Sequence, residues 1–200
     1  MMKDIVSGIR SWPQWSERVG IFFYGTIVPE AGLIIDPVEP TDDVMGALSA
    51  AGATTILLTN RNHFRAAARV KAQTGARVLV HPDDAAFVVE KGVAVDGPLA
   101  HGQKVGPFTL IDASGKSPGE VALHWPERRI LIVGDCCVCK APGQLTLLPE
   151  KVMDDPARLR ATLARIAETV DFDTVLCGDG EPILSGGREA LRALVASFPS

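Results

Sequence analysis

Several apolar segments of this 200-residue chain are followed directly by polar residues that could perform chemistry. The densest group is Thr59–Arg65, TNRNHFR, which comes after the apolar run Ile56–Leu58. It supplies two amides, one imidazole and two guanidinium groups within seven residues. Proteins of the α/β class usually keep binding and catalytic groups in loops at the exits of buried strands. We therefore expect this segment to form part of a functional site.

Four further segments have the same character. They are Asp36 after the run Leu33–Ile35, the turn Ser114–Gly119, the pair Gly134-Asp135, and the triplet Gly178-Asp179-Gly180. Each is expected to be a loop that follows a buried strand. The loops at one end of a sheet lie near one another, so all five could gather at one edge of the sheets.

In their order and spacing, these segments resemble the landmarks of the metallo-β-lactamase superfamily, and the resemblance covers nearly the whole chain. The family has a strand-end Asp, a T-H-x-H-x-D-H motif, a G-H-[ST]-P-G-S turn, a G-D pair and a final G-H-G. Here the turn is matched by Gly115–Gly119, the strand with its Asp by Ile130–Asp135, and the final motif by Val175–Pro182. The resemblance implies an α/β (α+β) fold, a four-layer αββα sandwich formed by residues 1–200 as a single domain. It also implies hydrolase chemistry.

The metal ligands of the family do not carry over. Its two leading His positions hold Asn60 and Asn62, its Asp position holds Phe64 and the last His position holds Arg65. The His of the turn is replaced by Lys116, and the His of the final motif by Asp179. Asp135 keeps the family residue, while His63 falls at a position that is not a ligand. Zinc needs three or four His, Cys or carboxylate ligands, so we expect no metal cofactor at the family's dinuclear site.

The charges suggest a replacement for the metals. Without a cation, Asp135 and Asp179 would be two unpaired buried carboxylates, which is costly. Lys116 can provide a point charge and Arg65 a bidentate clamp. The main hypothesis is a divergent family member whose Lys/Arg–Asp cluster binds a small anionic molecule. The candidate catalytic residues are Lys116, Asp135 and His63, and the candidate ligand-binding residues are Asn60, Asn62, Arg65 and Asp179.

A second hypothesis retains one metal. His63, Asp135 and Asp179 could hold a single Zn, Fe or Mn ion that activates water on an ester-type substrate. The alternative is a purely structural role, in which His63 is a strand-end residue hydrogen-bonded to the backbone. Whether the protein is an enzyme is left open between these hypotheses.

The four cysteines leave two alternatives open. Cys136, Cys137 and Cys139 follow Asp135, and Cys177 precedes Asp179. Thiols near the site could bind a soft metal or sense redox conditions. The alternative is that Cys136 and Cys177 are small buried apolar residues. Their spacing does not indicate a secreted disulfide framework.

Composition restricts the class of partner. The net charge of −4 and the isoelectric point near 5.6 argue against nucleic acid as the main partner. No apolar run is long enough for a spanning helix, and no basic cluster suggests a membrane surface. The N-terminal segment lacks the apolar core of a signal peptide, so a cytoplasmic location is expected. A small-molecule ligand is the partner that remains; the oligomeric state is not indicated.

Alternating strands and helices must position these loops. We expect β structure over residues 5–36, a helix from Thr41 or Asp42 to about Ala51, and a strand over residues 54–58. A helix over 64–74, a strand over 77–80 and a helix start at Pro82 should follow. The second half should contain a meander over 92–110, a hairpin of strands 121–125 and 129–133, a helix over 156–170, a strand over 174–177 and a last helix over 188–196.

Overall fold

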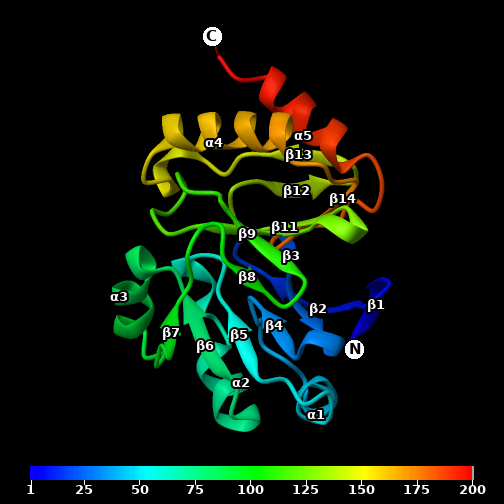
Figure 1. Cartoon of the computed structure of the whole chain (residues 1–200), viewed down its shortest axis with the longest axis vertical. Coiled ribbons are helices and arrows are strands. Elements are labelled where there is room, and N and C mark those ends of the chain that lie inside the picture. The colour runs from blue at the N-terminus through cyan, green and yellow to red at the C-terminus, as the bar shows by residue number, and fades with distance from the viewer. Residues whose placement is uncertain (200) are drawn as a thin grey trace. The chain divides into compact units, whose positions relative to one another are not determined.

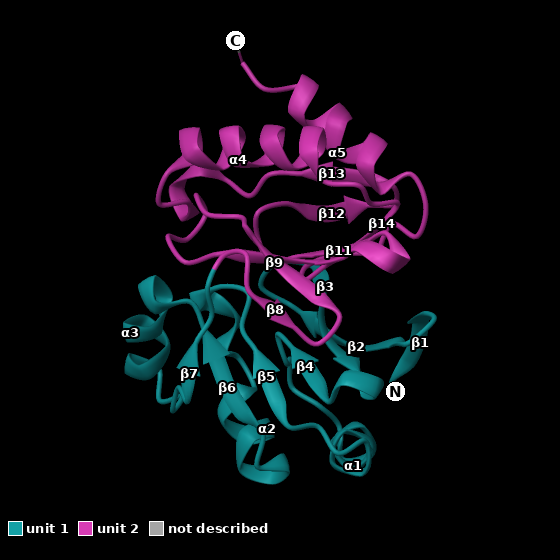
Figure 2. Cartoon of the chain, viewed as in Figure 1, with its two compact units in different colours: residues 1–100 teal, residues 101–200 magenta. Residues whose placement is uncertain are grey.

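Two compact units make up the chain in the computed structural model, which describes residues 1–199. The first unit is Met1–Ala100 and the second begins at His101 (Figure 2). Each unit contains one large β-sheet and its own helices. The expectation of a single domain stays a prediction.

Unit 1 is built on a seven-stranded sheet whose strands follow one another in chain order (Figure 1). Strands β1 to β4 are antiparallel neighbours, whereas β4 to β7 run parallel. Parallel neighbours need crossover connections, and α1 and α2 lie in two of them. The strands are β1 (Lys3–Val6), β2 (Ile9–Ser16), β3 (Ile21–Val28), β4 (Leu33–Ile35), β5 (Thr55–Leu57), β6 (Arg77–Val80) and β7 (Gly97–Pro98). The helices are α1 (Asp42–Ala50), α2 (Ala67–Thr74) and α3 (Pro82–Glu90), with short 3-10 helices η1 (Pro29–Ala31) and η2 (Arg61–Phe64).

The core of unit 1 lies between the parallel strands and helices α1 and α2. Ile34, Ile56 and Val78 come from three neighbouring strands, and Leu48 and Val70 come from the two helices. All five side chains are fully buried. Because both faces of the short parallel strands are covered, these strands are almost entirely apolar, as the sequence predicted.

Unit 2 is built on a five-stranded sheet in the order β14-β11-β10-β9-β8, with a separate two-stranded sheet of β12 and β13. Strands β11 and β14 pair in parallel, with Val133 opposite Cys177. The strands are β8 (Lys104–Val105), β9 (Phe108–Asp112), β10 (Val121–Trp125), β11 (Ile130–Val133), β12 (Val138–Ala141), β13 (Gln144–Thr146) and β14 (Thr174–Cys177). The helices are α4 (Pro156–Thr169) and α5 (Gly187–Ala196), with 3-10 helices η3 (Pro126–Arg128) and η4 (Glu150–Val152).

Helix α4 covers the core of unit 2 together with α5 (Figure 1). The predicted apolar stripe of α4 is confirmed, since Leu159, Leu163 and Ile166 are fully buried. Asp155 caps the helix by accepting a hydrogen bond from the Arg158 backbone N–H at 2.9 Å. Burial of one face, rather than helix propensity alone, stabilises a helix of this length.

The predicted elements are confirmed with two corrections. The helix expected over 64–74 begins at Ala67, because residues Arg61–Phe64 form the tighter 3-10 turn η2. The hairpin of β12 and β13 was not predicted. Its strands have only four and three residues on either side of Pro142-Gly143, so they carry weak strand signals and are fixed by pairing in the folded unit.

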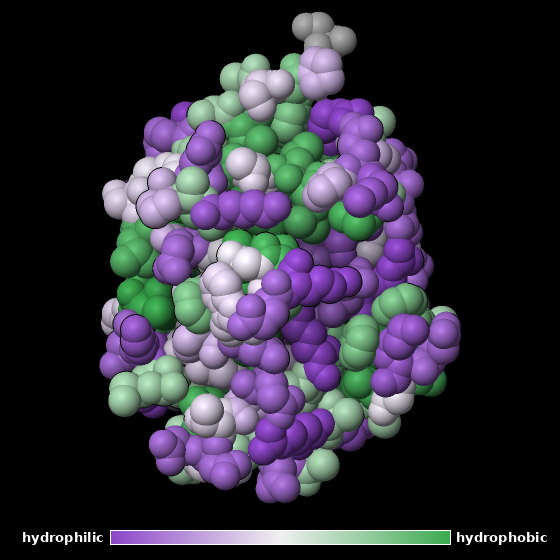
Figure 3. All heavy atoms as spheres, turned by 180° about the vertical axis from the view of Figure 1, so that it is seen from behind, coloured by the Kyte–Doolittle hydropathy of each residue, from purple (hydrophilic) through white to green (hydrophobic). Residues whose placement is uncertain are grey.

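Hydrophilic and hydrophobic side chains are interspersed on the face of the molecule shown in Figure 3. The exposed large apolar side chains include Trp15, Phe22, Val89 and Leu184. The rings of Trp15 and Phe22 contact each other, whereas Val89 and Leu184 come from other parts of the sequence. Within residues 1–199, none of the helices combines the length and apolar character needed to cross a membrane.

Candidate functional site

In unit 1, the ends of two parallel strands are joined through Asp36. Its backbone N–H donates to the Leu57 carbonyl at 3.0 Å. Its carboxylate accepts hydrogen bonds from the Thr59 backbone N–H at 2.8 Å and from the Thr59 hydroxyl at 2.6 Å. Asp36 is buried and has a φ of 48°, in the left-handed region that non-glycine residues seldom adopt. The loop after β5 is therefore anchored to the end of β4.

His63 belongs to the same buried network. Its Nδ1 atom lies 2.8 Å from Oδ2 of Asp36 and 3.0 Å from the Thr59 hydroxyl oxygen. The imidazole is fully buried. One alternative from the sequence was a residue bonded to the backbone, whereas the partners of Nδ1 in unit 1 are side chains.

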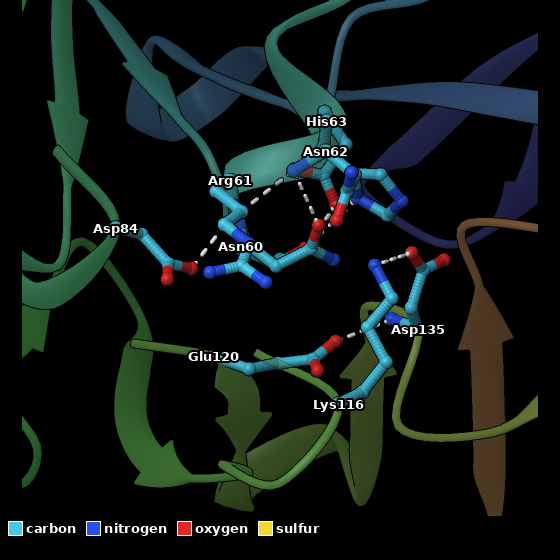
Figure 4. Close-up of polar contacts among 10 residues, drawn as sticks. Asn60, Arg61, Asn62, His63, Asp84, Lys116, Glu120 and Asp135 are labelled. Atoms are coloured by element: carbon cyan, nitrogen blue, oxygen red, sulfur yellow. Dashed lines mark hydrogen bonds and ion pairs between the residues drawn. The ribbon is translucent and has the colours of Figure 1, made fainter. Parts of the chain in front are cut away.

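The predicted ligand-binding loop is held by its own polar groups (Figure 4). The Asn60 side-chain oxygen accepts the Asn62 backbone N–H at 2.9 Å and so caps the 3-10 turn η2. Asp84, fully buried in α3, accepts the Arg61 backbone N–H at 2.8 Å. Sequence reasoning missed Asp84 as a site residue. The available signal was its position in the first turn of the helix that follows β6.

Aromatic rings support the charged end of this loop. The guanidinium of Arg65 lies over the Phe23 ring, 4.0 Å from its centroid. Phe64, at the family's Asp position, packs against the hydrophobic core of unit 1 and has its ring centroid 6.3 Å from that of Phe87. Position 64 is therefore part of the packing in this chain.

In unit 2, Lys116 and Asp135 form a buried ion pair (Figure 4). The Lys116 ammonium nitrogen lies 2.6 Å from Oδ2 of Asp135, and the two side chains are 5% and 6% exposed. Glu120, fully buried, accepts the Asp135 backbone N–H at 2.5 Å through Oε1. One predicted contact, between Lys116 and Asp135, is thus present.

The turn that carries Lys116 is held against the start of helix α4. The backbone N–H groups of Asp154 and Asp155 donate to the carbonyls of Lys116 at 3.2 Å and Gly115 at 2.8 Å. Gly115 has a φ of 137°, and a Cβ atom there would lie 2.4 Å from the Leu159 backbone nitrogen. Only glycine permits this approach, so the position of Lys116 depends on the packing of the turn on α4.

Asp179 lies in the loop after β14, beside the strand β11 that leads to Asp135. It is buried, and its carbonyl accepts the Cys139 backbone N–H at 3.2 Å. Next to it, Gly180 has a φ of 94°, and a Cβ there would lie 2.0 Å from the Cys139 carbonyl oxygen. The parallel pairing of β11 and β14 therefore places the loops of both carboxylates at the same end of one sheet.

All four cysteines are buried free thiols in unit 2. A hydrogen bond with Cys137, together with burial, raises the pKa of Cys136 well above its ordinary value. Burial, with a smaller effect of the neighbouring Cys139, likewise raises the pKa of Cys177 well above its ordinary value. These thiols stay protonated at neutral pH, which matches the expectation of small buried apolar residues.

The site residues predicted from the sequence are divided between the two units. Asn60, Asn62, His63 and Arg65 belong to unit 1, whereas Lys116, Asp135 and Asp179 belong to unit 2. Each unit orders its own set through the contacts described above. The expectation that the two sets gather at one edge stays a prediction.

Solved structures share the fold at low sequence identity. A metallo-β-lactamase from Erythrobacter litoralis matches with a TM-score of 0.78 and 15% identity, over 98% of this chain and 96% of that one. One from Pontibacter korlensis gives a TM-score of 0.76 at 13% identity, over 99% of each chain. One from Pseudomonas aeruginosa, solved in a mono-zinc form, gives a TM-score of 0.76 at 16% identity, over 100% of this chain and 96% of that one. The predicted fold class, the metallo-β-lactamase-like αββα sandwich, is confirmed.

Two curated relatives are both named hydroxyacylglutathione hydrolase. The protein from Fuscovulum blasticum is 29% identical over 165 residues, which are 78% of this chain and 60% of that protein. The protein from Erythrobacter litoralis is 34% identical over 93 residues, 44% of this chain and 35% of that protein. The chain thus spans less than two thirds of the length of each of these relatives. The model of the metallo-beta-lactamase superfamily matches residues 5–198, and the chain therefore belongs to this superfamily.

Proposed function

We propose that this chain is a divergent member of the superfamily in which an internal ion pair takes the place of the metals, and that it binds a small anionic molecule. The observation that carries the proposal is the buried contact of 2.6 Å between Lys116 and Asp135. Asp135 is the residue that keeps the family's metal-ligand identity. Its Oδ2 is here neutralised by an organic cation.

The chemistry of the other ligand positions supports the loss of the dinuclear site. Asn60 uses its side-chain oxygen to cap η2, and amide oxygens are weak zinc ligands. Phe64 packs against the core, and Arg65 carries a fixed positive charge. A divalent metal at Asp135 would also meet the ammonium of Lys116. This donor set does not fit two zinc ions, so no step of the proposed function passes through such a centre.

The anionic character of the ligand is argued from the charges. The positive charge of Lys116 is neutralised by Asp135, and Glu120 adds a second buried carboxyl group beside that pair. The charge that attracts an anion must therefore come chiefly from another cation. Arg65 suits this role, because stacking on Phe23 orients its planar guanidinium, a group that binds carboxylates in a bidentate manner.

The names of the curated relatives suggest the ligand class. A hydroxyacylglutathione carries carboxylates and a thioester bond, so it combines negative charge with a hydrolysable group. We propose glutathione thioesters, or molecules of similar charge, as ligands of this chain. As a hydrolase-like activity, we propose that the chain also hydrolyses the thioester bond of such ligands.

Metal content and anion binding test the proposal together. Untagged protein purified without chelators should contain no stoichiometric zinc, iron or manganese by elemental analysis. S-methylglutathione, an anionic probe without a thioester, should bind in equilibrium dialysis. Loss of one charge-assisted contact in Lys116→Ala or Arg65→Met should weaken its binding about tenfold or more.

Lys140→Ala is the matched control, because Lys140 is an exposed lysine of unit 2. This variant should bind the probe as the unmodified protein does. Near-stoichiometric metal would contradict the ion-pair part of the proposal. Unchanged affinity in both Lys116→Ala and Arg65→Met would contradict the anion-binding part.

A single-metal hydrolase is the second candidate, and one observation favours it. Histidines that bind metals usually donate their other ring N–H to a carboxylate, and Nδ1 of His63 contacts Asp36 in this way. The ligand set His63, Asp135 and Asp179 draws on both units and stays a prediction. Zinc, iron or manganese that is bound by the unmodified protein and lost from His63→Ala would support this candidate.

A further inference from the structure

Two hydrogen-bond donors of Thr59 and the imidazole of His63 converge on the carboxylate of Asp36. Thr59 contributes its backbone N–H to Oδ1 at 2.8 Å and its hydroxyl to Oδ2 at 2.6 Å. Nδ1 of His63 lies 2.8 Å from the same Oδ2. All three residues are buried. Both oxygens of Asp36 thus act as hydrogen-bond acceptors towards Thr59.

The positions of the protons follow from these contacts. The Thr59 hydroxyl proton points to Asp36, so Thr59 cannot donate it to His63. The Thr59 hydroxyl oxygen lies 3.0 Å from Nδ1 of His63 and, having given its proton to Asp36, can only accept there. Nδ1 must therefore carry a proton, which it donates to the Thr59 hydroxyl oxygen, while Oδ2 of Asp36 lies 2.8 Å from the same nitrogen. In the neutral imidazole, the lone pair then resides on Nε2.

The backbone at Asp36 is strained in a way that serves this contact. A non-glycine residue is strained in the left-handed region, and Asp36 has a φ of 48°. Strain of this kind persists where the surrounding structure requires it, and it is concentrated at functional sites. The two hydrogen bonds from Thr59 and the contact with Nδ1 of His63 are the local contacts that hold it.

We propose that His63 is the catalytic base of a metal-free hydrolytic reaction and that Asp36 and Thr59 are its positioning residues. This inference rests on the proposed function, with a thioester or similarly activated acyl group as the substrate. His63 would replace the metal as the group that activates water. An Asp bonded to Nδ1 orients the imidazole and stabilises the imidazolium that forms during proton transfer.

The reaction balances without a further reagent. Nε2 of His63 accepts a proton from water as the water oxygen forms a bond to the acyl carbon. The carbon–sulfur bond of the resulting tetrahedral species then breaks, and the sulfur takes the proton back from Nε2. One thioester and one water molecule give one carboxylic acid and one thiol, and His63 returns to its neutral form.

Nitrogen NMR of the imidazole tests the proton position directly. The chain has four histidines, so single His→Gln variants assign every imidazole signal. In protein labelled with ¹⁵N-histidine, His63 should show the Nδ1–H tautomer, whereas free histidine in water prefers Nε2–H. In Asp36→Asn, His63 should change to the Nε2–H tautomer, because the amide group can donate to Nδ1. Asn has nearly the volume of Asp and also tolerates the left-handed backbone, so the fold is preserved.

Hydrolysis of p-nitrophenyl acetate by chelator-treated protein tests the catalytic role. His63→Gln should reduce the rate to that of the solution without protein. Asp36→Asn should lower kcat about 100-fold or more with little change in KM. His124→Gln should match the unmodified protein, because His124 is bonded to the Asp171 carbonyl in unit 2.

Each outcome separates this inference from the proposed function. An Nε2–H tautomer in the unmodified protein, or hydrolysis unaffected by His63→Gln, would overturn the catalytic base while leaving anion binding intact. Loss of S-methylglutathione binding in Lys116→Ala with an unchanged His63 tautomer supports both. Failure of that probe to bind, with the predicted tautomer and hydrolysis present, removes the anion site alone.

Discussion

At the scale of single residues, buried charge explains why Lys116 and Asp135 occur together. An ion removed from water without a partner costs several kcal/mol, so each residue requires the other. Their contact of 2.6 Å and the low exposure of both side chains meet this requirement. Glu120 adds a hydrogen bond to the Asp135 backbone, which fixes the loop that carries the carboxylate.

Removal of one residue of the ion pair should therefore lower the free energy of unfolding far more than removal of both residues. Lys116→Met should lower the free energy of unfolding by about 3–5 kcal/mol, because Asp135 is left without its ammonium. The double variant Lys116→Met, Asp135→Leu should recover most of this loss. Urea unfolding of the two single variants and the double variant measures the coupling. A loss below about 1 kcal/mol in Lys116→Met, the range of exposed pairs, would contradict the account of a buried ion pair.

The buried thiols predict the behaviour of the protein at alkaline pH. The pKa values of Cys136 and Cys177 are raised in the folded chain, whereas unfolded thiols ionise near about 8.5. Above that pH the unfolded state has lost protons that the folded state keeps. Stability should therefore be fully present below about pH 8.5 and should fall as the pH rises towards the folded pKa values.

Urea unfolding at pH 7 and pH 9.5, in the presence of a reducing agent, measures this effect. Each such thiol contributes a slope of up to about 1.4 kcal/mol per pH unit. The variant Cys136→Ala, Cys177→Ala should lose less stability than the unmodified protein over the same interval. Equal losses in the two proteins would show that other groups control the alkaline transition.

At the scale of elements, strand ends and one helix position the polar groups. In unit 1, parallel pairing places Ile35 opposite Leu57, so the loops with Asp36 and Thr59 leave the sheet together. In unit 2, the parallel pair β11 and β14 does the same for the loops with Asp135 and Asp179. Lys116 is placed differently, because its turn is bonded to the residues that precede α4.

Gly115→Ala should show how strongly that turn depends on α4. The new Cβ would lie 2.4 Å from the backbone of Leu159 at a φ of 137°, so the turn or the helix must move. We expect a loss of more than about 2 kcal/mol, together with weaker binding of S-methylglutathione. Gly143→Ala is the control, since Gly143 has a φ of 74° but no atom within 4 Å of the added Cβ.

The control should lose only about 1 kcal/mol, from backbone strain alone. Thermal unfolding and equilibrium dialysis of the two variants make the comparison. Equal losses of stability in both would show that strain, and not contact with α4, governs the turn.

At the scale of the whole molecule, the chain keeps the family's fold at low sequence identity. Structures that share only 13–16% of its residues superimpose over nearly its entire length. Each unit has an apolar core of its own, which stabilises the fold by burying hydrophobic side chains. A fold of this kind can host a different chemistry when the loops at its strand ends are replaced.

Zinc should therefore stabilise this protein little. A ligand that binds the folded state at 100 times its dissociation constant adds about 2.7 kcal/mol to the free energy of unfolding. At a concentration of about 100 µM zinc, we expect no rise in Tm for the unmodified chain, because the ammonium of Lys116 occupies the carboxylate of Asp135. In Lys116→His, which restores a family ligand at the turn, a larger rise should be seen by differential scanning fluorimetry. A rise of several degrees in the unmodified chain would favour the single-metal hydrolase.

The sequence by itself determined the fold class and most of the elements, and the replaced ligand positions stay a prediction. Apolar runs, helix caps and glycines act locally, so α1, α4 and the parallel strands could be predicted from them. The sequence also indicated that Lys116 should pair with a carboxylate, because a buried ammonium requires one. Only the tertiary structure decided that Asp36 binds Nδ1 of His63, that Asp84 holds the Arg61 backbone, and that Gly115 packs on Leu159. These contacts join residues 23 to 44 positions apart, and the distances and directions that define them arise only when strands and helices have packed.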